Sequence, residues 1–372
     1  MDGFTERNEA ITMIEIKALE SGEDYVRMGA VDEQDRTQSS GRFIFTASQF
    51  GDRSVPTMLV GAIGTPIQYR RGGNVRAMIE KMHLVASERG ITVALLHPFS
   101  FSYYRKFGYE KVSDHLILRF PTRLLDFVPR ACRLVPYEDS MSEALVQCYH
   151  TFAKGRNLLL PRRAGSFGGD TWAYMKDGKC LAYLIGSGEK KLIVNHHEQG
   201  VFTVKEAAYT CPEGLMELFS YLHLYEGEFD EIVFANIAPC PEIEMMLRHY
   251  THTKYTIVPD IMARVINTRL LLEAHTYPAG SGSFVIRVND TLPTVKGTFT
   301  VTWENADATV TETPDASPDL TVDAPALARL LYGYDGVTAS SAPFLPGLTL
   351  HSPSSSVFAA FPKTPCGVFE HF

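Results

Sequence analysis

The segment from residue 58 to residue 96 constrains the fold more than any other part of the chain. Two short apolar runs, "MLVGAI" at 58–63 and "ITVALL" at 91–96, are typical of buried strands. Between them, apolar residues at helical spacing predict an amphipathic helix that stops at Gly90. Those residues are Val75, Met78, Ile79, Met82, Val85 and Ala86. The order strand, turn, helix, strand predicts an α/β unit.

The turn before this helix, "YRRGG" at 69–73, has the composition of an anion-binding site. The first N–H groups of a helix have no partner within the helix, and the helix dipole adds positive charge there. Glycines let the backbone approach a ligand closely, and two arginines add further charge. A loop with solvated arginines is the alternative interpretation of the turn taken alone.

Composition excludes several classes of protein. A length of 372 residues suggests two or three domains, and a formal net charge of −8 argues against a nucleic-acid binder. The six cysteines form no C-x-x-C pair, so we interpret them as reduced thiols. No apolar stretch reaches the roughly 18 residues of a membrane-spanning helix, and the opening residues lack the features of a signal peptide. We therefore expect a soluble, cytoplasmic protein.

Histidine pairs occur at His196 and His197 and at His249 and His252. No cysteine or carboxylate set completes a ligand spacing around either pair, so we expect no metal site.

Three domains are predicted along the chain. Residues 1–130 contain strand-like "MIEIKAL", "RFIFTAS" and "HLILRF" around the strong helix, and residues 131–277 repeat a similar order of elements. Residues 278–372 follow a Pro/Gly/Ser linker and contain alternating strands and a helix capped by Asp323, with Pro325 in its first turn. The predicted class is α/β for the first two domains and α+β for the third.

The residues then show a resemblance to a known family. "YRRGGNVRAMI" at 69–79 looks like the R-x-x-G-x-G/A coenzyme A loop of the GNAT acetyltransferases, and "HPFSFSYYRKFGYE" at 97–110 is similar to a stretch of their Eis-like subfamily, named for enhanced intracellular survival. Those proteins have a GNAT domain, a degenerate GNAT-like domain and a sterol-carrier-protein (SCP2)-like domain, so the resemblance covers nearly the whole chain. It implies an acetyl-CoA-dependent N-acetyltransferase that forms a homo-oligomer, a hexamer.

By this resemblance, six residues bind acetyl-CoA. The main chain at a strand end pairs with the pantetheine arm, and the loop holds the pyrophosphate; the residues are Ile63, Thr65, Arg70, Arg71, Gly73 and Val75. Val75 stands where the general motif has Gly or Ala, but it still offers its backbone N–H.

Two further residues carry the chemistry by the same resemblance. Tyr104 matches the general acid that protonates the departing thiolate. The pKa of a phenol, ~10, is about 1.5 units above that of a thiol, so this proton transfer is uphill by roughly 2 kcal/mol. The general base of the family is its C-terminal carboxylate, here that of Phe372. The tail is apolar enough to be docked, and burial would raise the pKa of this carboxylate toward a useful value. The alternative for both residues is a packing role.

One interval departs from the family pattern. Residues 20–41 are too few for the two helices and the further strand that normally line the acceptor side, so we assign no acceptor-contacting residue, and a weakened or lost activity is an alternative. The predicted function is direct transfer of acetyl to a primary amine. The acidic composition favours a cationic acceptor such as an aminoglycoside-like compound, a polyamine or a lysine side chain. The alternative function is a non-catalytic lipid- or sterol-binding protein that uses its third domain on a GNAT scaffold.

Overall fold

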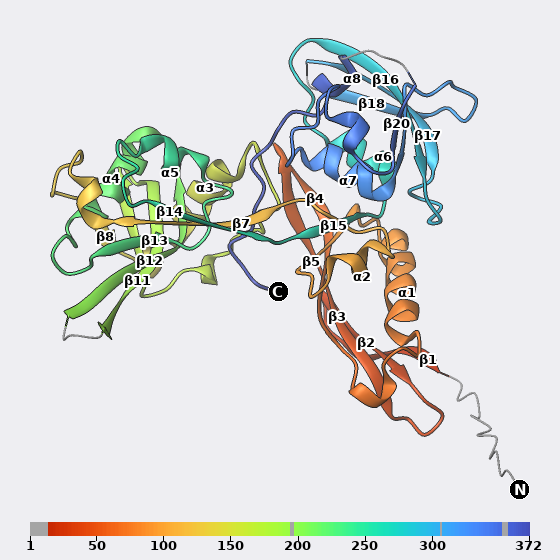
Figure 1. Cartoon of the computed structure of the whole chain (residues 1–372), viewed down its shortest axis with the longest axis horizontal. Coiled ribbons are helices and arrows are strands. Elements are labelled where there is room, and N and C mark those ends of the chain that lie inside the picture. The colour runs from red at the N-terminus through yellow and green to blue at the C-terminus, as the bar shows by residue number, and fades with distance from the viewer. Residues whose placement is uncertain (1–13, 194–196, 306, 352–355) are drawn as a thin grey trace, which may run out of the picture.

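The computed structural model describes residues 14–193, 197–305, 307–351 and 356–372. Within those residues the chain forms three lobes, each built around its own β-sheet (Figure 1). None of the helices in these ranges has the length and apolarity needed to cross a membrane. The opening residues, in which we expected no signal peptide, lie largely outside the described ranges.

The first sheet has the strand order β1-β2-β3-β4-β5-β15-β6, with β9 paired to β3. Strands β1 to β4 form an antiparallel meander, whereas β4 and β5 are parallel and are connected through α1. The bounds are β1 Glu15–Ser21, β2 Tyr25–Val31, β3 Thr37–Gly51, β4 Arg53–Gly64, α1 Asn74–Glu88, β5 Val93–Leu96, α2 Phe101–Arg105, β6 Glu110–Lys111, β9 Arg156–Asn157 and β15 Met262–Val265.

The predicted helix is confirmed as α1, and its predicted apolar face packs into the core of the first lobe. Predicted residues that are fully buried on this face are Met78, Ile79, Met82 and Ala86. The helix ends at Glu88, and Gly90 follows with φ of +70°, a left-handed conformation that glycine adopts without strain. Local periodicity and a glycine stop were therefore sufficient to predict this element.

The interval at residues 20–41 contains the whole of strand β2 and its two connections, which were not predicted from the sequence. Strand β2 pairs antiparallel with both β1 and β3. Between residues 20 and 41, all of which the structure describes, there is no helix. This part of the sheet is consequently built by strands alone.

The second sheet contains a strand from the predicted first domain, and the first sheet contains a strand from the predicted second domain. The segment "HLILRF", which we predicted as a strand of the first domain, lies in β7 (Asp114–Pro121) and pairs with β13 and β14 in the second sheet. Conversely, β15 comes from the predicted second domain and pairs with β5 and β6 in the first sheet. Alternation identifies a strand but not its partner, and for this reason the placement of "HLILRF" was wrong.

The second sheet has the strand order β14-β7-β13-β12-β11-β10-β8. Its strands β12 and β13 are parallel and are connected through α4, the same arrangement as β4, α1 and β5 in the first lobe. The bounds are β8 Leu134–Pro136, α3 Ser142–Ala153, β10 Thr171–Lys176, β11 Lys179–Ile193, β12 His197–Tyr209, α4 Pro212–His223, β13 Glu231–Phe234, α5 Pro241–Met246 and β14 Lys254–Pro259.

The third lobe is a sheet of order β18-β17-β16-β19-β20 with helices packed against it. The predicted cap is confirmed: the Asp323 carboxylate accepts a hydrogen bond from the N–H of Ala326 at 2.9 Å, and Pro325 lies in the first turn of α7. The bounds are α6 Thr268–Ala274, β16 Ser281–Asn289, β17 Gly297–Glu304, β18 Asp307–Glu312, β19 Leu320–Asp323, α7 Ala324–Tyr332, β20 Leu348–Leu350 and α8 Ser356–Ala359.

After α8 the chain leaves the third lobe and runs between the other two (Figure 1). Asn157 holds this tail on both sides of Cys366, because its N–H donates to the carbonyl of Pro365 at 2.9 Å and its carbonyl accepts from the N–H of Gly367 at 3.2 Å. Further along, the amide of Asn236 donates to the carbonyl of Val368 at 2.8 Å. The tail is docked, as its apolar composition predicted.

Candidate functional site

The first sheet opens at the end of β4. The parallel pairing of β4 with β5 ends at Val60 and Leu96, whereas β4 continues to Gly64 with β3 as its partner. The β3–β4 register shifts between the pairs Arg42–Gly61 and Ser40–Gly64, and Ala62 has φ of +50° within this bulge. The last residues of β4 therefore have a main-chain edge that β5 does not occupy.

The loop between β4 and α1 presents backbone N–H groups toward solvent at the positive end of α1. Gly73 is the N-cap residue, with φ of +82°, so the N–H groups of the next three residues begin the helix without a partner inside it. Arg71 also has a left-handed backbone, with φ of +70°, which is uncommon for a residue with a side chain. Such strain is typically retained where the surrounding structure has a functional constraint.

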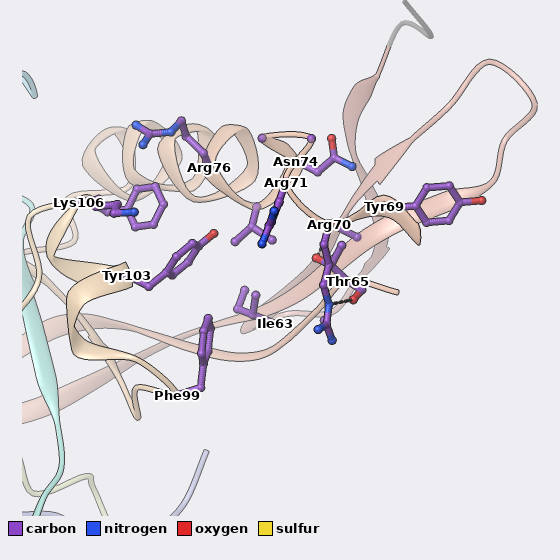
Figure 2. Close-up of a pocket in the computed structure, with 16 residues that line it drawn as sticks. Ile63, Thr65, Tyr69, Arg70, Arg71, Asn74, Arg76, Phe99, Tyr103 and Lys106 are labelled. Atoms are coloured by element: carbon purple, nitrogen blue, oxygen red, sulfur yellow. Dashed lines mark hydrogen bonds between the residues drawn. The ribbon is translucent and has the colours of Figure 1, made fainter. Parts of the chain in front are cut away.

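A cavity of about 670 Å³ lies between this loop, the end of β4 and α2. All six residues predicted to bind acetyl-CoA line it: Ile63, Thr65, Arg70, Arg71, Gly73 and Val75. Figure 2 shows the side chains of Arg71, Tyr103 and Phe99 around the opening. The Nε of Arg70 donates to the carbonyl of Thr65 at 3.2 Å, which ties the loop to the strand end (Figure 2).

The two neighbouring tyrosines of α2 have different positions. Tyr103 lines the cavity, whereas Tyr104 is buried at 3 % exposure and its ring contacts those of Phe99, Tyr103 and Tyr109. Burial, with a smaller contribution from Tyr103, raises the pKa of Tyr104 to about 12. The predicted acid is therefore more firmly protonated than an ordinary phenol.

The chain end lies on the other face of the sheet. A side-chain carbon on Gly61 would stand 3.0 Å from the carboxyl carbon of Phe372, a contact tight enough that the chain end would have to shift by a few tenths of an ångström. The next residues of β4 alternate between faces: Ala62 points away from α1 and Ile63 toward the cavity on the α1 side. The predicted base therefore lies at β4, whereas the predicted acid, Tyr104, is packed among the rings around α2.

A polar cluster beside the chain end was not predicted. Nδ1 of His97 lies 2.7 Å from a carboxylate oxygen of Asp260, and the rings of His371 and Phe372 lie 4.7 Å and 4.6 Å from the ring of His97. Nε2 of His97 is buried and has no hydrogen-bond partner among the described residues. His97 directly follows β5, and ligands in open α/β sheets bind at the carboxyl ends of strands, so its position could have drawn attention to it. Asp260 could not be found in this way, because it joins the cluster through the exchange of β15.

Within the described ranges, no group of three or more His, Cys, Asp or Glu side chains is arranged to hold a metal ion. Of the histidine pairs considered in the sequence analysis, His196 lies outside these ranges.

Comparison with known proteins identifies two domains. Residues 2–112 match the acetyltransferase (GNAT) domain family, and residues 269–342 match the sterol carrier protein domain family. No curated protein sequence matches this chain.

Solved structures share the architecture. A GCN5-related N-acetyltransferase from Anabaena variabilis has a TM-score of 0.79 and 18% identity, over 93% of this chain and 89% of that chain. Eis1 from Mycobacterium abscessus has a TM-score of 0.78 and 19% identity, over 97% of this chain and 100% of that chain. A GCN5-related N-acetyltransferase from Kribbella flavida has a TM-score of 0.78 and 14% identity, over 93% and 87%. At these identities the likeness shows the fold, which is the mixed α/β architecture expected from the sequence.

The contact between Gly61 and the chain end gives a testable prediction. In a Gly61→Ala variant, the added methyl group would crowd the Phe372 carboxyl group. Overpacking typically costs about 1–3 kcal/mol, so the docked chain end should become roughly 5- to 150-fold less favoured. We expect carboxypeptidase A to release Phe372 correspondingly faster from this variant.

The matched control is Gly169→Ala, because a side-chain carbon on Gly169 would meet no atom within 4 Å. Equal rates of Phe372 release from Gly61→Ala and from the parent protein would show that the chain end does not rest against Gly61.

Proposed function

We propose that this chain, which contains a GNAT acetyltransferase domain, transfers an acetyl group from acetyl-CoA to a primary amine by direct attack. The observation that carries the proposal is the convergence of six residues on one cavity. They come from the end of β4, the following loop and the first turn of α1, and they combine an unpaired strand edge with a positive helix end.

The residues of the cavity suit the two parts of coenzyme A. The N–H groups at the start of α1, with Arg70 and Arg71, would bind the pyrophosphate. The free main-chain edge at Ile63–Thr65 would pair with the pantetheine arm as an added strand does. The site would then supply the acetyl group at the open end of β4, between the two faces of the sheet.

The transfer needs one acid and one base. The chain-end carboxylate of Phe372 would accept a proton from the amine, and a C–N bond would form at the acetyl carbon as the C–S bond breaks. Tyr104 would then give its proton to the departing sulfur. The imidazole of His97, oriented by Asp260, lies beside the chain end and is a second candidate to accept the amine proton.

Burial changes the energetics expected for Tyr104. Its pKa of about 12 is about 3.5 units above that of a thiol, near 8.5. Proton transfer from this phenol to the thiolate would therefore cost roughly 5 kcal/mol, rather than the roughly 2 kcal/mol expected from the sequence. Positive charge or a new hydrogen bond near the phenolate must reduce this gap when the cavity is filled. Tyr103, on the cavity wall beside Tyr104 in α2, is an alternative donor.

The match of residues 269–342 to the sterol carrier protein domain family is the finding that supports the alternative function of lipid binding. In the third lobe, aromatic rings fill the core by packing on one another; Phe284 contacts Trp303 and Phe361, and Tyr277 stacks on Trp303. A cytoplasmic location and a hexameric assembly are retained as proposals that rest on composition and on the resemblance.

Arg70 and Arg71 provide the direct test of coenzyme A binding. Each charged contact to a phosphate should contribute about 1.5–3 kcal/mol, so replacing both by Ala should weaken acetyl-CoA binding at least about tenfold in a calorimetric titration. The control replaces Arg123 and Arg248 by Ala, which removes two exposed arginines outside the residues lining the cavity. Parental affinity in the Arg70/Arg71 variant would contradict the assignment of the loop.

The neighbouring tyrosines form a matched pair for the acid. Tyr104→Phe removes one proton donor and keeps the ring, so kcat should fall by ~10² to 10⁴ with acetyl-CoA affinity nearly unchanged. Tyr103→Phe should leave kcat within about threefold of the parent. If the Tyr103 variant shows the large loss instead, the donor is Tyr103; if neither variant does, the tyrosines only shape the cavity.

A further inference from the structure

A second hollow, of about 360 Å³, lies on the face of the first sheet that points away from α1. Side chains from three strands line it, including Glu20, Tyr25, Arg27 and Arg42, and Ala62 of the β4 bulge forms part of its wall. Because Ala62 faces this hollow and Ile63 faces the cavity on the α1 side, consecutive residues of β4 separate the two spaces.

The hollow adjoins the chain end through the sheet register. Glu20 is paired with Arg27, Arg27 with Arg42, and Arg42 with Gly61. Residues directly opposite in antiparallel strands present the same face, and neighbouring strands are about 4.8 Å apart. Since the carboxyl group of Phe372 lies over Gly61, a single row across four strands carries negative, positive, positive and negative charge in that order.

The two arginines in the middle of this row lack anionic partners. Like charges directly opposite in antiparallel strands are destabilising, yet neither Arg27 nor Arg42 forms an ion pair with any residue of the described ranges. The guanidinium group of Arg42 lies 4.5 Å from the centre of the Tyr25 ring, and the Tyr25 hydroxyl donates to Glu20. The stacking and the hydrogen bond hold Arg42, Tyr25 and Glu20 together without an ion pair to Arg42.

We propose that the acceptor is an amine that also carries an anionic group, a carboxylate or a phosphate, about one to two strand spacings (roughly 5–10 Å) from its nitrogen. Arg27 and Arg42 hold the anionic group, since guanidinium groups bind carboxylate and phosphate in a bidentate manner, and the amine lies at the chain-end carboxylate. This inference rests on the proposed function. It replaces the cationic acceptor expected from the net charge, because the local charges of the hollow differ from the average over the chain.

Direct binding of matched amines tests the inference. The probes share one chain length and differ at the far end: 6-aminohexanoate, its uncharged amide 6-aminohexanamide, and the dication hexane-1,6-diamine, with 4-aminobutyl phosphate as the phosphate probe. Calorimetric titration is done on the full-length protein in complex with CoA, so that turnover does not interfere. We expect an anionic probe to bind at least about tenfold more tightly than the amide, and whichever anionic probe binds more tightly identifies the preferred group.

Replacing Arg27 and Arg42 by Gln should remove this preference and leave CoA affinity within about twofold of the parent. The control variant, with Arg123 and Arg248 replaced by Gln, should retain the preference, because it changes the net charge equally but leaves the hollow intact. Turnover of the same amines, followed by released thiol, should show the preference in KM.

The outcomes separate the two proposals. If CoA binds but neither anionic probe binds more tightly than the amide, or if the Arg27/Arg42 variant keeps the preference, the inference is overturned and the proposed function stands. If the parent protein binds neither CoA nor acetyl-CoA, the proposed function fails and the inference fails with it.

Discussion

The position of the chain end depends on one buried residue, Asn157. Besides holding the tail through its main chain, it accepts a hydrogen bond from the N–H of Gly51 at 2.7 Å and donates one to the carbonyl of Tyr332 at 2.8 Å through its side-chain amide. It therefore joins the end of β3, the end of α7 and the tail at a site with 2 % exposure, where unpaired polar groups are costly. The first lobe, the third lobe and the tail are held together at this point, and the tail leaves it directed toward the open end of β4.

The open end of β4 gives the site two sides. One side has the loop of Arg70 and Arg71 and the cavity under α1; the other has the chain end, the hollow with Arg27 and Arg42, and the pair of His97 and Asp260. If β4 had no bulge at Ala62 and stayed paired with β5 beyond Val60, the sheet would separate these two sides completely. The chemistry that we propose depends on this irregular stretch, at which an acetyl group from one side and an amine from the other could meet.

Local features of the site were predictable from the sequence, and features that depend on strand partners were not. The strands around α1, the loop of Arg70 and Arg71, and the Asp323 cap each follow from residues close together in the chain. The exchange of β7 and β15 arises from pairing between distant segments, for which alternation gives no partner. Strand β2 pairs with its sequence neighbours, but its residues, "YVRMGAV", do not alternate strictly, so neither the strand nor the opposed pair of Arg27 and Arg42 was predicted. The same limit applies to Tyr104, because its burial results from the packing of the aromatic rings around α2.

We propose that the charge at the chain end, rather than the Phe372 ring, takes part in catalysis. Semisynthesis with a tail peptide that ends in either a free carboxylate or a carboxamide would change that charge and no side chain. We predict that the amide reduces kcat by ~10² to 10⁴ relative to the free acid prepared in the same way, with acetyl-CoA affinity and melting temperature nearly unchanged. Equal turnover of the two proteins would contradict the account and leave Phe372 with a packing role alone.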